Sequence, residues 1–200
     1  MANGRMDTDM LDRAIIFAVR SHAGTQRRGK DFPYIVHPLE AMTIVSTMTS
    51  DQELLAAAVL HDTVEDTDVT IEEIRAVFGS RVADLVKAES DVPEPGVSPE
   101  ESWKRRKRES IKRLSEASRD SKMVALGDKL SNMRAIARDY ANSGDDLWGL
   151  FHVKDRESHE WHYRGLAEAL SELSDTAAYR EFIYLIDSVF GNGTTQDIIG

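Results

Sequence analysis

The sequence predicts an all-α protein, a single bundle of about eight or nine helices. Apolar residues recur at the three- and four-residue steps of helices through most of the chain. No segment shows the alternation of apolar and polar residues that is typical of a half-buried strand. A length of 200 residues, 41% of them hydrophobic, suits one domain with a core of its own.

The N-terminal part is expected to form four helices. Residues 7–22 carry an apolar stripe at helical spacing, and a polar loop with two glycines follows them. Pro38 lies in the first turn of the second helix, where proline is well tolerated. Residues 51–64 are apolar around most of the circumference, a pattern that indicates a central helix. Thr70 and Glu73 form the capping-box pattern that opens a short fourth helix.

The C-terminal part is expected to be helical as well. The short helix should end at Gly79, and residues 90–99, which hold three of the five prolines, are predicted to form an exposed loop. Four more helical segments follow this loop: 101–114, 120–139, 147–173 and 176–190. We expect residues 1–190 to form the domain and residues 191–200 to be a flexible tail.

The composition excludes several kinds of chemistry. Without cysteine, the chain cannot use a thiolate nucleophile or a cysteine metal site, so any metal must be held by His, Asp and Glu. No apolar run approaches the roughly 20 residues that span a bilayer, and no signal peptide is recognisable, so a cytoplasmic protein without a membrane partner is expected. The net charge of −10 disfavours nucleic acid as a partner, although local Arg and Lys could still bind a small anion.

The run of residues 61–66, His-Asp-Thr-Val-Glu-Asp, is the strongest chemical signal in the sequence. It ends the most apolar helix of the chain, where buried carboxylates and an imidazole are costly unless something compensates them. A divalent metal ion would compensate, because carboxylate oxygen and imidazole nitrogen are good ligands for Mn²⁺, Fe²⁺ or Zn²⁺. His61 and Asp62 can reach one ion, while Glu65 and Asp66, a turn further on, stay available for acid–base work.

Two more ligands can be proposed for this ion. His37 directly precedes Pro38 at a helix start, and Asp128 lies in an otherwise apolar stretch of a later helix. Each alone could be structural, as a hydrogen-bonding histidine or a buried ion pair. Together with His61 and Asp62 they make a set of two nitrogens and two oxygens with positions left open for water.

Other polar residues can be interpreted as structural as well as functional. The basic run 104–108 spreads around its helix, so a solvated face is expected, with a contribution to a phosphate pocket as the functional alternative. A second metal site could be suggested by three histidines beside Trp161 and Tyr163, but packing is expected instead: His152, His159 and His162. Arg134 and Arg138 are expected to form ion pairs, with a contribution of Arg134 to the site as the functional alternative.

The motifs resemble those of the HD superfamily of metal-dependent phosphohydrolases, and more narrowly the hydrolase domain of RelA/SpoT proteins and the free-standing small alarmone hydrolases. The resemblance rests on QRRGKDFPYIVHP, on AAAVLHDTVEDTDVTIEEIRAVFGSRVADLV and on ALGDKLSNMRAI. It covers residues 8–140 as a motif core, and residues 145–190 would add C-terminal helices.

The resemblance implies a role for each matching residue. The implied metal ligands, with Mn²⁺ as the usual ion, are His37, His61, Asp62 and Asp128. The implied catalytic acids, which would position or deprotonate the attacking water, are Glu65 and Asp66. The implied substrate contacts are Arg27, Arg28 and Asn132, and Lys129 could also hold phosphate oxygens. The chain departs from the usual family residues at Gly127, Ser131 and Ala135, which bears on nucleotide selectivity.

Three functions therefore compete. The first is a manganese-dependent hydrolase that removes the 3′-pyrophosphate of ppGpp or pppGpp to give GDP or GTP. The second is an HD phosphohydrolase of another nucleotide, such as NADPH or a 3′-phosphorylated nucleotide. The third is a non-catalytic nucleotide-binding regulatory module, which the retention of every motif residue disfavours. The oligomeric state stays open.

Overall fold

The computed structural model describes residues 7–27, 29–90 and 98–191, except for the side chains of residues 99–101. Within these ranges the chain forms ten α-helices, one of them a single turn, and two 3₁₀ helices. The expected all-α fold is therefore confirmed. In the same ranges no strand forms, and an isolated antiparallel bridge joins Gln26 to Pro33.

The α-helices are α1 (Asp9–Ser21), α2 (Val36–Val45), α3 (Gln52–Leu60), α4 (Thr63–Asp66), α5 (Ile71–Phe78), α6 (Ser80–Glu89), α7 (Pro99–Ser115), α8 (Arg119–Ser143), α9 (Arg156–Ala169) and α10 (Ala177–Phe190). The 3₁₀ helices are η1 (Gly144–Leu150) and η2 (Ser171–Leu173). None of the helices described is both long enough and apolar enough to cross a lipid bilayer.

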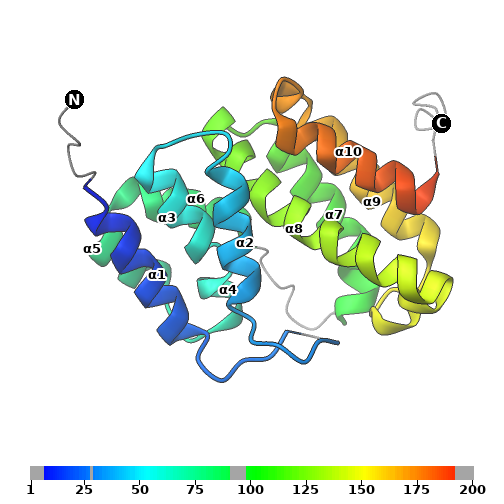
Figure 1. The fold of residues 1–200 in the computed structure, drawn as a ribbon, viewed down its shortest axis with the longest axis horizontal. Helices are drawn as coiled ribbons and strands as arrows, with labels where there is room; N and C mark the ends of the chain where they lie inside the picture. Colours follow the sequence, from blue (N-terminus) through cyan, green and yellow to red (C-terminus); the bar gives the residue numbers. More distant parts are fainter. Residues whose placement is uncertain (1–6, 28, 91–97, 192–200) are drawn as a thin grey trace, which may run out of the picture.

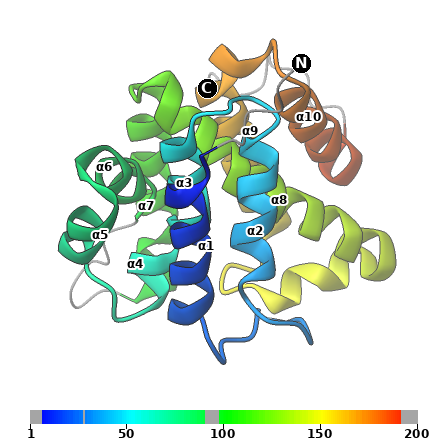
Figure 2. The ribbon, with the colours of Figure 1, turned by 60° about the vertical axis from the view of Figure 1, so that its left-hand side comes forward.

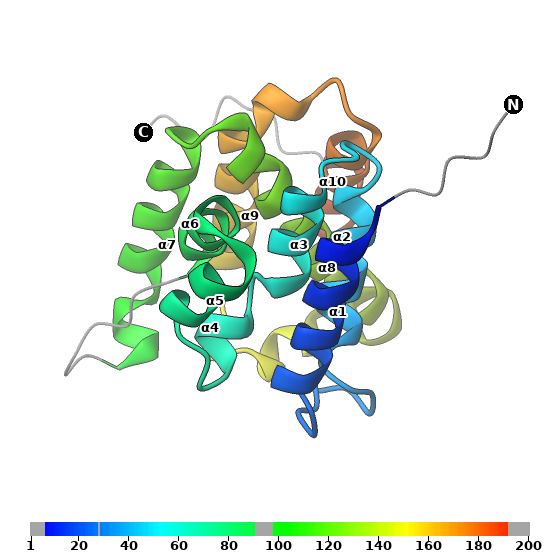
Figure 3. The ribbon, with the colours of Figure 1, turned by 90° about the vertical axis from the view of Figure 1, so that its left-hand side faces the viewer.

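The long helix α8 is the axis of the fold. It packs against α2, α3 and α6 on one side and against α10 and η1 on the other, so it joins the two ends of the bundle (Figure 1). Its interior surface is apolar, with Leu126, Leu130 and Met133 fully buried. The helices α7 and α9 pack on each other, away from α1 and α2 (Figure 3).

The apolar helix α3 lies at the centre of the N-terminal half, as its composition predicts. All seven residues from Leu54 to Leu60 are buried, and α1 packs along the helix (Figure 2). The predicted continuous helix over 51–64 is wrong, because α3 ends at Leu60 and a separate turn of helix, α4, begins at Thr63. At the break, Nδ1 of His61 lies 2.8 Å from the carbonyl oxygen of Ala58, so the side chain satisfies an acceptor of the last turn.

Local signals predicted several helix ends well. The capping box of Thr70 and Glu73 is present at the start of α5, and the helix ends before Gly79, whose φ of +90° favours glycine. The predicted helix over 147–173 is interrupted, because residues 151–155 form an irregular link between η1 and α9. The predicted loop at 90–99 lies mostly outside the described residues, as does nearly all of the tail.

Gly127 allows α8 to approach α2 closely. A Cβ atom built on Gly127 would lie 2.6 Å from Cγ2 of Val45 and 2.8 Å from the carbonyl oxygen of Ala41. The oxygen belongs to backbone, so an added methyl group would push the two helices apart. The absence of a side chain at residue 127 therefore sets the distance between the helices that carry His37 and Asp128.

We expect Gly127→Ala to lower the free energy of unfolding by about 1–2 kcal/mol, because overpacking outweighs the gain of about 1 kcal/mol in helix propensity. Gly165→Ala is the matched control. Its Cβ would meet Cδ1 of Ile111 at 2.7 Å, the far end of a side chain that can turn away. Urea unfolding of both variants should show the larger loss at residue 127, and equal or no losses would contradict the packing argument.

Candidate metal centre

Four side chains that the sequence singled out as metal ligands converge at one point. Nε2 of His37 lies 3.1 Å from Oδ1 of Asp128 and 3.4 Å from Oδ2 of Asp62. Nε2 of His61 lies 2.9 Å from the same oxygen of Asp62 and 3.6 Å from that of Asp128. His37, His61 and Asp128 are buried, and their ligand atoms lie within 4.8 Å of one another.

The fold brings these residues together from three places in the chain. His37 lies in the first turn of α2, Asp128 lies in the middle of α8, and both helices pack on α3. His61 and Asp62 occupy the break between α3 and α4, so the end of the most buried helix points at the other two ligands. The break is what lets two adjacent residues face the same point.

His61 presents an unused nitrogen to this point. Its Nδ1 donates to the carbonyl oxygen of Ala58, which places the proton on Nδ1 and the lone pair on Nε2. His61 is 2% exposed, and Nε2 has no hydrogen-bond partner among the described residues. A buried nitrogen without a partner, surrounded by carboxylate oxygens, fits a divalent metal ion. The His-His-Asp group is therefore suited to such an ion.

Charges around the centre hold Asp128 ionised. Burial alone would raise the pKa of Asp128, but the ammonium group of Lys129 keeps it well below its usual range. Nζ of Lys129 lies 2.5 Å from Oδ2 of Asp128 and 3.5 Å from Oε2 of Glu89. Burial raises the pKa of Glu89. Lys129 thus balances negative charge beneath the centre.

The acid pair lies at the rim of a cavity of about 300 Å³ next to the metal centre, which we call the metal-end cavity. Glu65 and Asp66 are exposed residues of the one-turn helix α4 and line this cavity together with His37, Asp62 and Asp128. A water or a phosphate group in the cavity can therefore meet both the proposed ligands and the carboxylates of the acid pair.

Two of the expected substrate contacts also lie beside the centre. Asn132 donates from Nδ2 to Oδ1 of Asp128 at 2.5 Å, and its Oδ1 accepts from Nη2 of Arg27 at 2.6 Å. This bond ties the loop before α2 to α8. Lys129 lines the metal-end cavity, and Arg28 lies outside the described residues.

A second pocket of about 460 Å³ adjoins the first, and we call it the apolar pocket. The two share Tyr34, Asn132 and two aromatic residues of the C-terminal half, Phe151 and Tyr163. The rest of the apolar pocket is lined mostly by apolar side chains, namely Ala135, Ile136, Leu147 and Leu150. The ion pair of Lys30 and Asp139 also lines it. A flat apolar group with a polar tail therefore fits across the two spaces.

The basic run and the C-terminal histidines behave mostly as the sequence suggested. Lys104 and Arg108 are exposed on α7, whereas Lys107 is half-buried and lines the metal-end cavity. His159 stacks on Trp148 with ring centroids 5.1 Å apart, and its Nε2 lies 2.7 Å from the carbonyl oxygen of Val153. Packing thus accounts for His159.

His162 is buried as a neutral imidazole. Burial, with the positive charges of Lys107 and Lys129, keeps the pKa of His162 well below its usual value of 6.5. The unfolded chain therefore binds a proton near pH 6.5 that the folded protein does not accept. The resulting stabilisation is full above pH 6.5 and is lost as the pH falls below it.

Below pH 6.5, we expect the free energy of unfolding of wild type to fall more steeply with decreasing pH than that of His162→Phe. The slope for one proton is at most about 1.4 kcal/mol per pH unit. Urea unfolding of both proteins at pH 7 and pH 5 measures it. An identical pH dependence in the two proteins would show that His162 does not resist protonation.

Sequence reasoning missed three polar groups that touch the centre. Tyr34 donates its hydroxyl to Oδ2 of Asp62 at 2.6 Å, and burial with the negative charge of Asp62 raises its pKa, so the hydroxyl stays a donor. Glu89 supports Lys129 from the end of α6. Ser131 contacts Nδ1 of His37 at 2.8 Å. Tyr34 carried a local signal, its place shortly before His37 in the loop, and Ser131 stood out only as a departure from the usual family residues.

An all-helical bundle with a buried His-His-Asp group beside an acid pair is the arrangement of an HD domain. The model of the HD domain family matches residues 14–152, and the chain belongs to this family. The expected resemblance is confirmed.

Two relatives of this chain have names that state a specific enzymatic activity. The guanosine-3′,5′-bis(diphosphate) 3′-pyrophosphohydrolase MESH1 of Danio rerio is 36% identical over 136 residues, which cover 66% of this chain and 71% of that protein. A guanosine-3′,5′-bis(diphosphate) 3′-pyrophosphohydrolase of Aquifex aeolicus is 36% identical over 129 residues, 63% of this chain and 18% of that protein. The matched region is thus most of MESH1 but under a fifth of the longer relative.

Solved structures share the fold over most of the chain. A structure described as a metazoan ortholog of SpoT that hydrolyses ppGpp has a TM-score of 0.71 and 24% identity, covering 92% of this chain and 97% of that one. A crystal structure of a Listeria monocytogenes EGD-e protein has a TM-score of 0.67 and 28% identity, covering 77% and 98%. The similarity therefore extends beyond the motif core to C-terminal helices.

Proposed function

We propose that this chain is a manganese-dependent hydrolase of ppGpp and pppGpp that removes the 3′-pyrophosphate and leaves GDP or GTP. The observation that carries the proposal is the buried nitrogen of His61, unpartnered and facing His37 and two carboxylates at the edge of a cavity. The chain is 36% identical to a guanosine-3′,5′-bis(diphosphate) 3′-pyrophosphohydrolase, and the match covers 71% of that protein. This similarity supports ppGpp as the substrate.

The proposed ligands are His37, His61, Asp62 and Asp128. A bound Mn²⁺ would polarise a phosphoryl oxygen and lower the pKa of a coordinated water. Mn²⁺ suits a mixed set of imidazole and carboxylate ligands with open positions for water. The proposed domain, residues 1–190, stays a prediction.

Glu65 and Asp66 are the proposed acid–base groups. They line the metal-end cavity together with the proposed ligands, and there either carboxylate can orient a water or accept its proton. The water adds to the phosphorus of the 3′-diphosphate that is bonded to O3′. The bond between that phosphorus and O3′ breaks, and O3′ takes a proton to become the 3′-hydroxyl group. The other product is pyrophosphate.

The nucleoside would occupy the apolar pocket. Phe151 and Leu150 offer apolar surface to a base, and Asn132, which lines both spaces, lies where the sugar would cross from one to the other. Arg27 and Arg28 are proposed to hold the nucleotide from the loop, and Lys129 to hold phosphate oxygens at the metal end. A substrate held at both ends fits this arrangement better than a small phosphomonoester.

A second candidate is hydrolysis of another phosphorylated nucleotide, such as NADPH. Ala135 favours it, because this residue lines the apolar pocket without offering a hydroxyl group to a ribose. Initial rates of the Mn²⁺-loaded protein on ppGpp, NADPH and a nucleoside 3′-monophosphate separate the candidates. We expect the highest rate on ppGpp. Inertness towards ppGpp with rapid phosphate release from NADPH would favour the second candidate, and no turnover of any substrate would favour a binding module.

A further inference from the structure

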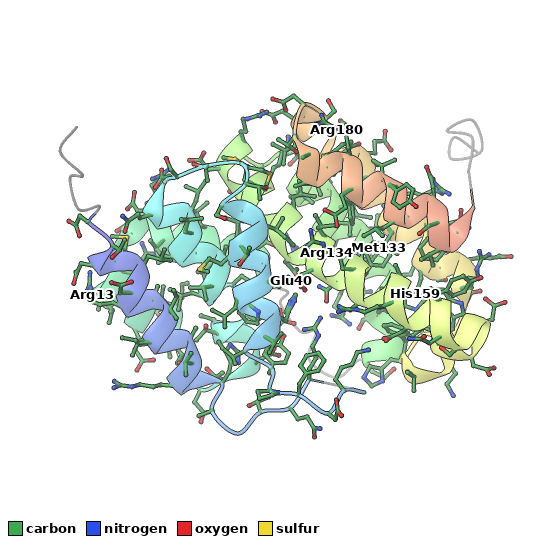
Figure 4. The ribbon with its side chains drawn as sticks, in the orientation of Figure 1. Arg13, Glu40, Met133, Arg134, His159 and Arg180 are labelled. Carbon is green, nitrogen blue, oxygen red and sulfur yellow. The ribbon has the colours of Figure 1, made fainter. Side chains whose placement is uncertain are left out.

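A line of hydrogen bonds runs from His37 away from the metal centre to α10. Nδ1 of His37 lies 2.8 Å from Oγ of Ser131, and that hydroxyl donates to Oε2 of Glu40 at 2.7 Å. Nη1 of Arg134 donates to the other oxygen of Glu40 at 3.2 Å. Nε and Nη2 of Arg134 bind the two oxygens of Glu181 at 2.7 and 2.8 Å. Figure 4 shows Glu40 and Arg134 next to each other where α2 meets α8.

The direction of these bonds fixes the proton of His37. A serine hydroxyl has one hydrogen, and the ionised carboxylate of Glu40 can only accept, so the hydrogen of Ser131 points to Glu40. Oγ of Ser131 must then accept from Nδ1 of His37. With the proton on Nδ1, the lone pair of His37 is on Nε2, the atom that lies 3.1 Å from Asp128.

We propose that Ser131 and Glu40 are positioning residues that set the tautomer and the ring orientation of His37 for a divalent metal ion. Ser131 acts on the ring directly, and Glu40 acts through Ser131. Arg134, clamped by Glu181 of α10, holds Glu40 in place. The inference rests on the proposed metal centre and is independent of which nucleotide is hydrolysed.

The burial of the contact makes Ser131 hard to replace. His37 is 3% exposed and Ser131 is 1% exposed, so the loss of the hydroxyl leaves a buried N–H without an acceptor. The ring can then exchange tautomers or rotate, and either change moves the lone pair away from the ion. Supporting partners of this kind are worth about 10- to 100-fold in metal affinity.

Isothermal titration of the metal-free protein with Mn²⁺ tests the proposal. We expect Ser131→Ala to raise the dissociation constant about 10- to 100-fold. Glu40→Gln keeps an oxygen that can accept from Ser131 and should lie closer to wild type than Glu40→Ala. Arg119→Gln is the matched control, because it breaks the contact of α8 with Asp175, just before α10, without touching this line of bonds.

A purely structural role predicts a different result. If these bonds only join α2, α8 and α10, Ser131→Ala lowers the melting temperature but binds Mn²⁺ like wild type, and this outcome overturns the proposal. Histidine ¹H–¹⁵N correlation spectra of the wild type loaded with diamagnetic Zn²⁺ give a second readout. A proton on Nδ1 of His37 supports the proposal, and an unprotonated Nδ1 overturns it.

The proposed function can fail separately. A wild-type protein that binds Mn²⁺ but leaves ppGpp intact contradicts the substrate and leaves the positioning role standing. A wild-type protein that binds no divalent ion overturns both the metal centre and the role of Ser131 and Glu40.

Discussion

Replacing His61 with alanine is expected to abolish Mn²⁺ binding and nucleotide hydrolysis together. His61 supplies a buried nitrogen that has no hydrogen-bond partner at the metal centre, and its removal leaves Asp62 and Asp128 facing each other without it. A metal ion contributes several kcal/mol to the transition state, so its loss should lower turnover by at least about 10³-fold. Metal titration and initial rates on ppGpp measure the two effects.

His152→Ala is the control for this substitution, because His152 is exposed and lies outside both pockets. It should retain wild-type affinity and turnover. Circular dichroism must show that His61→Ala stays folded. A folded variant with unchanged Mn²⁺ affinity would show that the ion, if any, lies elsewhere.

The second large effect is expected at the acid pair. Glu65→Gln and Asp66→Asn should keep the metal affinity, because neither side chain belongs to the proposed ligand set. If the substituted residue is the general base, its amide cannot take the proton from water, and turnover should fall about 10²- to 10⁴-fold. Titration with Mn²⁺ and single-turnover rates on ppGpp separate binding from chemistry.

Glu72→Gln provides the matched control, since Glu72 is an exposed acid nearby in α5 that lines neither pocket. It should turn over ppGpp at the wild-type rate. Full activity in both Glu65→Gln and Asp66→Asn would refute the acid–base role of the pair, and loss of metal in either would place that carboxylate among the ligands.

The fold was largely predictable, because local signals decide most of it. Helical periodicity predicted α1, α8 and α10, and the capping box of Thr70 and Glu73 opens α5 as expected. The break after Leu60 was not predictable from periodicity. No glycine or proline marks this point in the sequence, and the side-chain bond from His61 to the carbonyl oxygen of Ala58, which satisfies an acceptor of the last turn, is seen only in the structure.

The candidate ligands were also predictable, because imidazoles and carboxylates in apolar surroundings are conspicuous in a sequence. The groups that orient them were not. Ser131 and Glu40 carry no local sign of this role, and they matter because α2 and α8 pack together across more than 90 positions of the chain. Such long-range partners become visible only once the helices are placed.

Product analysis of a single reaction tests the proposed hydrolysis of ppGpp. Wild-type protein loaded with Mn²⁺ is incubated with ppGpp in ¹⁸O-enriched water. The products are separated by ion-exchange chromatography, and the ¹⁸O content of each is measured by mass spectrometry. We expect GDP and pyrophosphate in equal amounts, with one ¹⁸O atom in the pyrophosphate and none in GDP. Release of orthophosphate, ¹⁸O in the nucleotide, or intact ppGpp would contradict it.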